Sequence, residues 1–114
     1  AGAEKPRLEE ITTGAIDEQV DPEADETRDT VVELVFHNRG LARVGPALSA
    51  CAGLRLLDLS FNSLVALDGL HALANLRELR AYCNSLERLG GLEGCVRLEV
   101  LLVHGNRITG ATVP

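Results

Sequence analysis

Residues 76–86 read LRELRAYCNSL, and similar stretches occur elsewhere in the chain at a fixed spacing. Residues 54–64 read LRLLDLSFNSL and residues 98–108 read LEVLLVHGNRI, so the three copies start 22 residues apart. A weaker copy, VVELVFHNRGL, occupies residues 31–41 and has Arg39 where the other copies have asparagine. A fixed period of this length indicates a chain built from stacked structural repeats.

Each copy follows the pattern L-x-x-L-x-L-x-x-N-x-L with conservative replacements. Apolar residues at alternate positions predict a short strand that directs these side chains into a core. The asparagine stands where the chain must turn, because its amide can satisfy backbone groups that a turn leaves unpaired. Stacking of the copies therefore predicts a structural ladder of Asn62, Asn84 and Asn106. Leucine at every third position from Leu64 to Leu76 fits 3₁₀ turns that return the chain behind the strands.

The pattern resembles that of leucine-rich repeat proteins over residues 31–108. Its 22-residue period is similar to a subclass that includes a regulatory subunit of protein phosphatase 1, a light chain of axonemal dynein, a spliceosomal protein and many ciliary proteins. The resemblance implies an α/β solenoid with a short parallel β-sheet on the concave face and 3₁₀ turns and loops on the convex side. It also implies that the chain acts by binding other proteins.

The residues before the repeats predict a cap for the first of them. Residues 8–20 read LEEITTGAIDEQV and predict a short amphipathic helix, with Thr12 as its N-cap and Ile11 and Ile16 at the positions of a hydrophobic staple. A stack of repeats needs such a polar cap over the apolar edge of its first member.

Four segments follow from these assignments. We expect a tail over residues 1–7, the capping helix, an acidic linker over residues 21–30, and about three and a half repeats over residues 31–114. Because the last copy is followed by only a few residues, we expect the C-terminal repeat to be incomplete and the chain to be part of a larger protein.

The charge is uneven along the chain. Residues 1–30 contain three basic and ten acidic residues (3 − 10 = −7), whereas residues 31–114 contain eight and seven (8 − 7 = +1). The near-neutral repeat region does not favour nucleic-acid binding. No apolar run is long enough for a membrane span. We expect a cytoplasmic location, with the cilium or cytoskeleton favoured by the resemblance and the nucleus left open.

The strand phase predicts which side chains point away from the core, on the concave face. Three columns of such residues cross the sheet: Val35, Asp58, Arg80 and Leu102; His37, Ser60, Tyr82 and His104; and Asn38, Phe61, Cys83 and Gly105. Column neighbours lie about 4.8 Å apart, so we expect an ion pair between Asp58 and Arg80. Aromatic and arginine side chains typically anchor protein interfaces. The predicted partner contacts are Asp58, Phe61, Arg80, Tyr82, Cys83, Leu102 and His104.

Catalysis and metal binding are not favoured. Cys83 and His104 are close enough in this arrangement for a Cys–His pair, but an open sheet provides neither a pocket nor an orienting acid. The cysteines lack CxxC spacing, so we expect no metal site, and we expect no cofactor. Cys51 and Cys95 fall at inward positions and are expected to be small core residues.

The sequence therefore predicts a non-enzymatic interaction or scaffold module within a larger chain or complex. The expected partner is a protein, such as a helix or a component of a cytoskeletal or axonemal assembly, and the acidic N-terminal segment could contact a basic surface. Two alternatives stay open: a regulatory or targeting subunit of a protein phosphatase, and a factor in ribonucleoprotein assembly.

Overall fold

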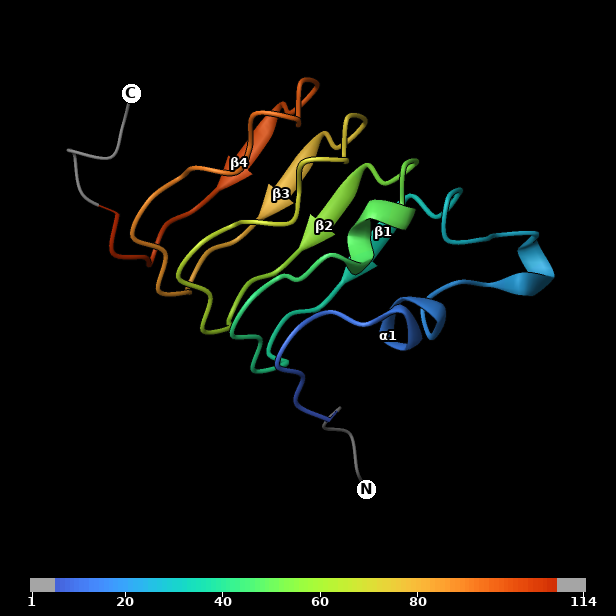
Figure 1. The fold of residues 1–114 in the computed structure, drawn as a ribbon, viewed down its shortest axis with the longest axis horizontal. Helices are drawn as coiled ribbons and strands as arrows, with labels where there is room; N and C mark the ends of the chain where they lie inside the picture. The colour runs from blue at the N-terminus through green and yellow to red at the C-terminus, as the bar shows by residue number, and fades with distance from the viewer. Residues whose placement is uncertain (1–5, 109–114) are drawn as a thin grey trace.

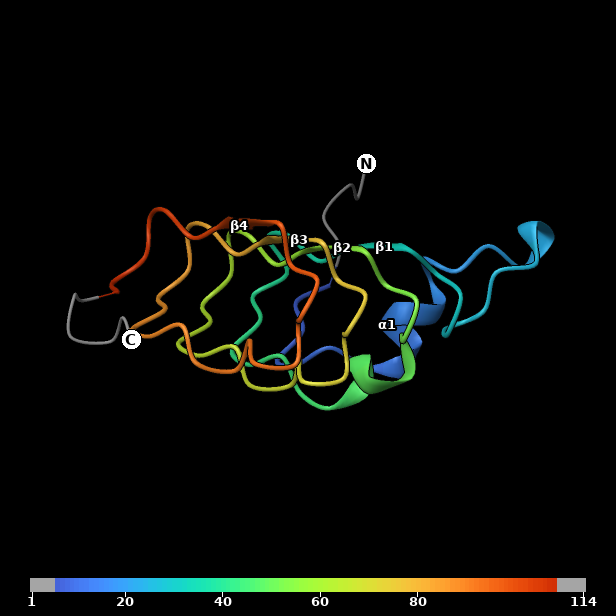
Figure 2. The same ribbon diagram turned by 90° about the horizontal axis from the view of Figure 1, so that it is seen from above.

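The structure, a computed structural model, describes residues 6–108. Its elements in chain order are α1 (Thr13–Asp17), the 3₁₀ helix η1 (Pro22–Ala24), β1 (Glu33–Val35), the 3₁₀ helix η2 (Ala47–Ala50), β2 (Leu56–Asp58), β3 (Glu78–Arg80) and β4 (Val100–Leu102). The four strands form one parallel sheet in the order β1-β2-β3-β4 (Figure 1). Parallel neighbours require a long connection between strands. Figure 2 shows these connections in a second layer behind the sheet.

The register of the sheet matches the spacing of the sequence copies. Leu57 pairs with Leu79, and Leu79 pairs with Leu101, so these partners lie 22 residues apart (79 − 57 = 22; 101 − 79 = 22). The first pair, Leu34 with Leu57, is separated by 23 residues (57 − 34 = 23). The predicted strand positions are therefore confirmed, and so is the predicted column that starts at Val35.

Leucines fill the space between the sheet and the return segments, which are residues 42–53, 65–75 and 87–97. The central strand leucines and the leucines of the every-third-residue run are fully buried: Leu34, Leu57, Leu79, Leu64, Leu67, Leu70, Leu73 and Leu76. Burial of one such side chain contributes roughly 1.5–3 kcal/mol, more than the net contribution of about 1 kcal/mol from one hydrogen bond. Strands of only three residues are therefore held mainly by this core.

The predicted 3₁₀ character of the return segments takes different forms along the chain. Only the first contains a 3₁₀ helix within the described residues, η2. In the next segment the N–H of Leu73 donates to Leu70 and that of Leu76 donates to Leu73, over three-residue steps. These are single 3₁₀-type turns, which place every third side chain on the same inward side.

The asparagines hold neighbouring turns together. Asn84 Oδ1 accepts the N–H of Leu64, 3.1 Å away in the preceding turn, and its Nδ2 donates to the carbonyls of Leu59 and Ala81. Asn62 also donates to Leu59, and Asn106 also donates to Ala81. The three amides are thus linked through shared backbone carbonyls and not through bonds to one another. Their predicted structural role is confirmed.

The N-terminal helix is shorter than predicted. Thr12 is its N-cap, as expected, and accepts the N–H of Ala15, but α1 has five residues instead of spanning residues 8–20. The prediction was wrong about length because residues 8–11 run extended along the first turn. There Leu8 donates to Arg39 and Ile11 donates to the carbonyl of Val44.

The cap nevertheless buries the side chains that the sequence assigned to it. Ile11 and Ile16 are fully buried, and Leu8 and Val20 pack against the core with partial exposure. Figure 1 shows α1 beside β1, at one end of the sheet.

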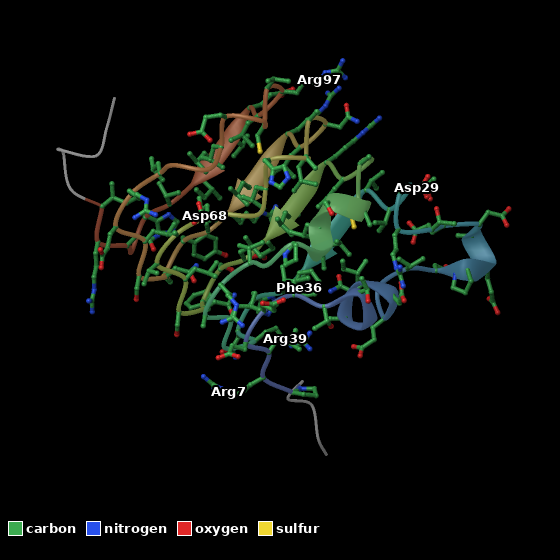
Figure 3. The ribbon with its side chains drawn as sticks, viewed as in Figure 1. Arg7, Asp29, Phe36, Arg39, Asp68 and Arg97 are labelled. Carbon is green, nitrogen blue, oxygen red and sulfur yellow. The ribbon has the colours of Figure 1, made fainter. Side chains whose placement is uncertain are left out.

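Two polar side chains complete this end of the molecule. Gln19 Nε2 donates to the Val35 carbonyl at 2.7 Å, and Gln19 Oε1 accepts the Val35 N–H at 2.8 Å. The Gln19 amide therefore bonds the outer edge of β1 as a neighbouring strand would. Arg39, which replaces asparagine in the first copy, is buried and donates from Nε to the carbonyl of Pro6. Figure 3 shows Arg39 beside the segment that carries Arg7.

The acidic segment 21–30 projects from the body (Figure 1) but has local order. Asp21 caps η1 by accepting the N–H of Glu23. Arg28 donates to both carboxylate oxygens of Asp17 at 2.7 Å, which ties the segment back to α1 and lowers the pKa of Asp17. The predicted linker thus contains a 3₁₀ helix and an ion-paired base.

Some expectations fall beyond the described residues. These are most of the tail, at residues 1–5, and the end of the repeat region, at residues 109–114. Among the helices of residues 6–108, none is long and apolar enough to cross a membrane.

Candidate protein-binding face

The outer sheet face consists of the strand residues that flank the buried leucines and of the residues just after each strand. Its first column is as predicted, because Asp58 pairs in register with Val35 on one side and with Arg80 on the other. Leu102 continues the column on β4 and is half-buried.

Three aromatic side chains from successive turns meet on this face. The rings of Tyr82 and His104 stack with centroids 4.7 Å apart and an angle of 6° between their planes. Phe61 meets Tyr82 edge-to-face, with centroids 5.5 Å apart and planes at 83°. We call Phe61, Tyr82 and His104 the aromatic ridge. Phe61 is 54% exposed and His104 is exposed as well, so the ridge presents apolar ring surface to solvent.

The residues just after the strands have a left-handed backbone. The φ angles are +54° at Asn38, +58° at Phe61, +58° at Cys83 and +72° at Gly105. This conformation costs a residue with a Cβ atom roughly 1–2 kcal/mol, which glycine avoids. The sequence analysis did not identify it, although asparagine and glycine at two of the four places were a signal. Phe61 is thus held on the outer face by a conformation that aromatic residues rarely adopt.

The polar side chains of the face differ from the prediction. Asp58 is 6% exposed, and its Oδ1 accepts from the N–H and the hydroxyl of Ser60. The expected ion pair between Asp58 and Arg80 is not formed. Arg80 Nε donates instead to Glu78, which lies on the same side of the same strand, and this bond raises the pKa of Arg80.

Asp58 is therefore a poor candidate for a direct partner contact, because its carboxylate is buried and already hydrogen bonded. Arg80 is half-exposed and keeps guanidinium nitrogens beyond the Nε that Glu78 occupies. The structure brings Phe61, Tyr82 and His104 together and places Arg80 and Leu102 beside them on neighbouring strand positions.

Cys83 lies in the same left-handed column as Phe61 and is half-buried. Its Sγ is close to Gly105, where an added Cβ would lie 3.0 Å away. Within residues 6–108, no group of three or more His, Cys, Asp or Glu side chains is arranged to hold a metal ion.

The other two cysteines are core residues, as expected. Cys51 is fully buried and Cys95 is 6% exposed, and both are free thiols. Cys95 Sγ donates to the Leu70 carbonyl at 3.5 Å. Burial raises the pKa of each of these two thiols, which lowers the fraction of reactive thiolate at a given pH.

A thiol-labelling experiment should separate the three cysteines. In the native protein at mildly alkaline pH, we expect Cys83 to react with a disulfide reagent at least about tenfold faster than Cys51 and Cys95, because only Cys83 is open to the reagent. Mass spectrometry after partial labelling identifies the modified sites. Equal rates at all three positions in the folded protein would show that the burial described here is wrong.

No protein-family model matches the sequence, and no curated protein is significantly similar to it.

Proposed function

We propose that the chain is a leucine-rich repeat module without catalytic activity, and that it binds a partner protein on its outer sheet face. The repeat assignment is supported by three features that agree: the 22-residue period of the sequence, the same spacing between strand partners, and the asparagines that bond each turn to its neighbour. In such a stack the sheet side forms an extended binding surface.

The aromatic ridge is the observation that carries the proposal. Phe61, Tyr82 and His104 come from three successive turns and form one continuous cluster, although no core residue requires their rings to lie outside. Backbone strain at an exposed residue supports a hypothesis of function, and Phe61 combines a left-handed backbone with high exposure. The ridge supplies rigid apolar area, and the guanidinium of Arg80 supplies a charged contact at its side.

A scaffold role in a ciliary or cytoskeletal assembly is the form of this function that the sequence resemblance favours. A role in ribonucleoprotein assembly is less favoured, because residues 31–114 have a net charge of only +1 and therefore lack a basic surface. No structural feature of the described residues favours phosphatase regulation over scaffolding.

The double variant Phe61→Ala/Tyr82→Ala tests the proposal. We expect it to lose, by about tenfold or more, the proteins that the wild type captures in cells by proximity labelling, because aromatic anchors carry most of the energy of an interface. The matched control is Val65→Ala/Val96→Ala, which removes two apolar side chains that are also exposed but lie in the return segments.

The circular dichroism spectrum of both variants should match that of the wild type, because none of the four side chains is buried. A double variant that folds and keeps the wild-type set of neighbours would overturn the assignment of the binding face. Loss of the same proteins from the control variant would move the binding surface to the return side.

A further inference from the structure

The two ends of the sheet differ in how they are finished. At the β1 end, the Gln19 amide bonds both backbone groups of Val35, and α1 and residues 8–11 cover the core. At the β4 end, Leu101, Val103 and Ile108 are only half-buried. The matching residues one turn earlier, Leu79, Ala81 and Leu86, are fully buried.

The same backbone bonds recur at every junction between neighbouring strands. The first is made by the residue just after each strand, whose N–H donates to the last residue of the next strand. These bonds run from Phe36 to Asp58 (2.8 Å), from Leu59 to Arg80 (2.6 Å) and from Ala81 to Leu102 (2.8 Å). The second runs two residues later, from Asn38 to Ser60, from Phe61 to Tyr82 and from Cys83 to His104.

The next donors in these two series are the N–H groups of Val103 and Gly105. Neither has an acceptor within residues 6–108. A third series runs the other way: Glu78 donates to the Arg55 carbonyl at 3.0 Å, and Val100 donates to the Arg77 carbonyl at 2.9 Å. The next acceptor in that series is the carbonyl of Glu99.

A hollow adjoins this row of backbone groups. It has a volume of about 570 Å³, is open to solvent, and is lined among others by Leu89, Leu101, Val103, Asn106 and Ile108. One turn earlier, the corresponding space beside Leu79 is filled by Leu101 of the next strand. The shape and the apolar lining of the hollow therefore fit a leucine on an added strand.

We propose that the edge of β4 binds a strand-and-turn segment of a partner protein, parallel to β4, with the pattern L-x-L-x-x-N-x-L. The segment's backbone bonds Val103, Gly105 and Glu99, and its first leucines enter the hollow. Its asparagine bonds the Ile108 N–H and the Val103 carbonyl, just as Asn106 bonds the Leu86 N–H and the Ala81 carbonyl. This edge is separate from the aromatic ridge, so the inference goes beyond the function proposed above.

Charge also describes the partner. Arg77 and Glu99 occupy the same place in neighbouring turns, just before the strand, and their side chains lie 3.7 Å apart. The segment that follows Glu99 should therefore have a basic residue at that place. A second copy of this chain is a poor occupant in the parallel sense, because it would have to present the β1 edge, which Gln19 closes.

The chain itself contains a suitable probe for a direct test. A synthetic peptide with the sequence of residues 75–87, carrying a serine in place of its cysteine, has Arg77 at the required basic position. Two N-methylated peptides are compared with it. Methylation at Glu78 blocks the N–H that would donate to Glu99, whereas methylation at Ala81 blocks an N–H that faces the opposite way.

Fluorescence anisotropy with the full 114-residue chain gives the affinities. We expect the unmodified and Ala81-methylated peptides to bind with dissociation constants within about twofold of each other, and methylation at Glu78 to weaken binding about tenfold or more. Val103→Pro in the protein, which removes one outward donor, should also abolish binding, whereas Val103→Ala should retain it.

Three results would overturn the inference: no binding of the unmodified peptide, equal effects of the two methylations, or a Val103→Pro variant that is folded and binds as the wild type does. Sedimentation equilibrium of the protein alone should give a monomer. A dimer that Val103→Pro dissociates would instead assign the edge to a second copy of the chain.

Discussion

Replacement of Asn84 by alanine is expected to lower the free energy of unfolding by about 3 kcal/mol, because one buried amide serves two turns. Asn84 is 8% exposed, and its side chain accepts the N–H of Leu64 and donates to the carbonyls of Leu59 and Ala81. The alanine variant leaves the Leu64 N–H buried without an acceptor. Such an orphaned group costs more than the net value of the bond itself.

Urea denaturation followed by circular dichroism measures this effect. Asn75→Ala is the matched control, because Asn75 lies in a return segment and donates a single exposed bond to the Ala52 carbonyl. We expect the control to change stability by less than about 0.5 kcal/mol. Asn84→Asp keeps the acceptor and removes the donor, so its stability should fall between the wild type and Asn84→Ala. If Asn84→Ala were no less stable than Asn75→Ala, the asparagines would not hold the turns together.

Gly94→Ala is expected to destabilise the protein by about 2–3 kcal/mol, because no space exists for the added methyl group. A Cβ at this position would overlap the backbone carbonyl of His71 in the preceding return segment. Backbone atoms cannot rotate away as the end of a side chain can. The variant must therefore push two return segments apart, over a core that contains Leu70 and Leu73.

Gly90→Ala provides the control in the same return segment. Its nearest neighbour to an added Cβ is Arg88 Nε, 3.9 Å away, and its φ angle is not left-handed. We expect its midpoint in urea to equal or slightly exceed that of the wild type, since alanine restricts the unfolded chain. Equal midpoints for the two alanine variants would contradict the close approach of the return segments at Gly94.

The sheet could be predicted from the sequence because its cause is periodic. Leu57, Leu79 and Leu101 recur at equal spacing, so their side chains identify both the strands and the register. The role of Asn84 could be predicted for a related reason, since its place in the pattern coincides with a turn. Prediction succeeded where each residue repeats the environment of its counterpart one turn away.

Features that occur once could not be predicted in this way. Gln19 bonds the β1 edge through its side chain, and nothing in the sequence links it to Val35, 16 residues away. Arg39 stands at an asparagine position because its neighbour is the N-terminal segment and not another turn. The length of α1 was also wrong, because residues 8–11 gain backbone bonds with the first turn in place of helical ones.

The partner face was predicted in its position but not in its polar chemistry. The columns follow from register, so Phe61 and Tyr82 were correctly placed on one face. The hydrogen bonds of Asp58 and Arg80 depend on local competition: Ser60 and Glu78 lie two residues away on the same strand side, and both reach their partners first. Strand spacing alone does not show such competition.

Hydrogen–deuterium exchange of the full chain, with and without the partner recovered by proximity labelling, tests the central claim most directly. If the partner covers the aromatic ridge, exchange should slow in residues 58–64, 80–86 and 102–108, which carry Phe61, Tyr82 and His104. It should remain unchanged in residues 65–75 and 87–97. Slower exchange confined to those two return segments would contradict the claim, because the partner would then occupy the opposite side of the molecule.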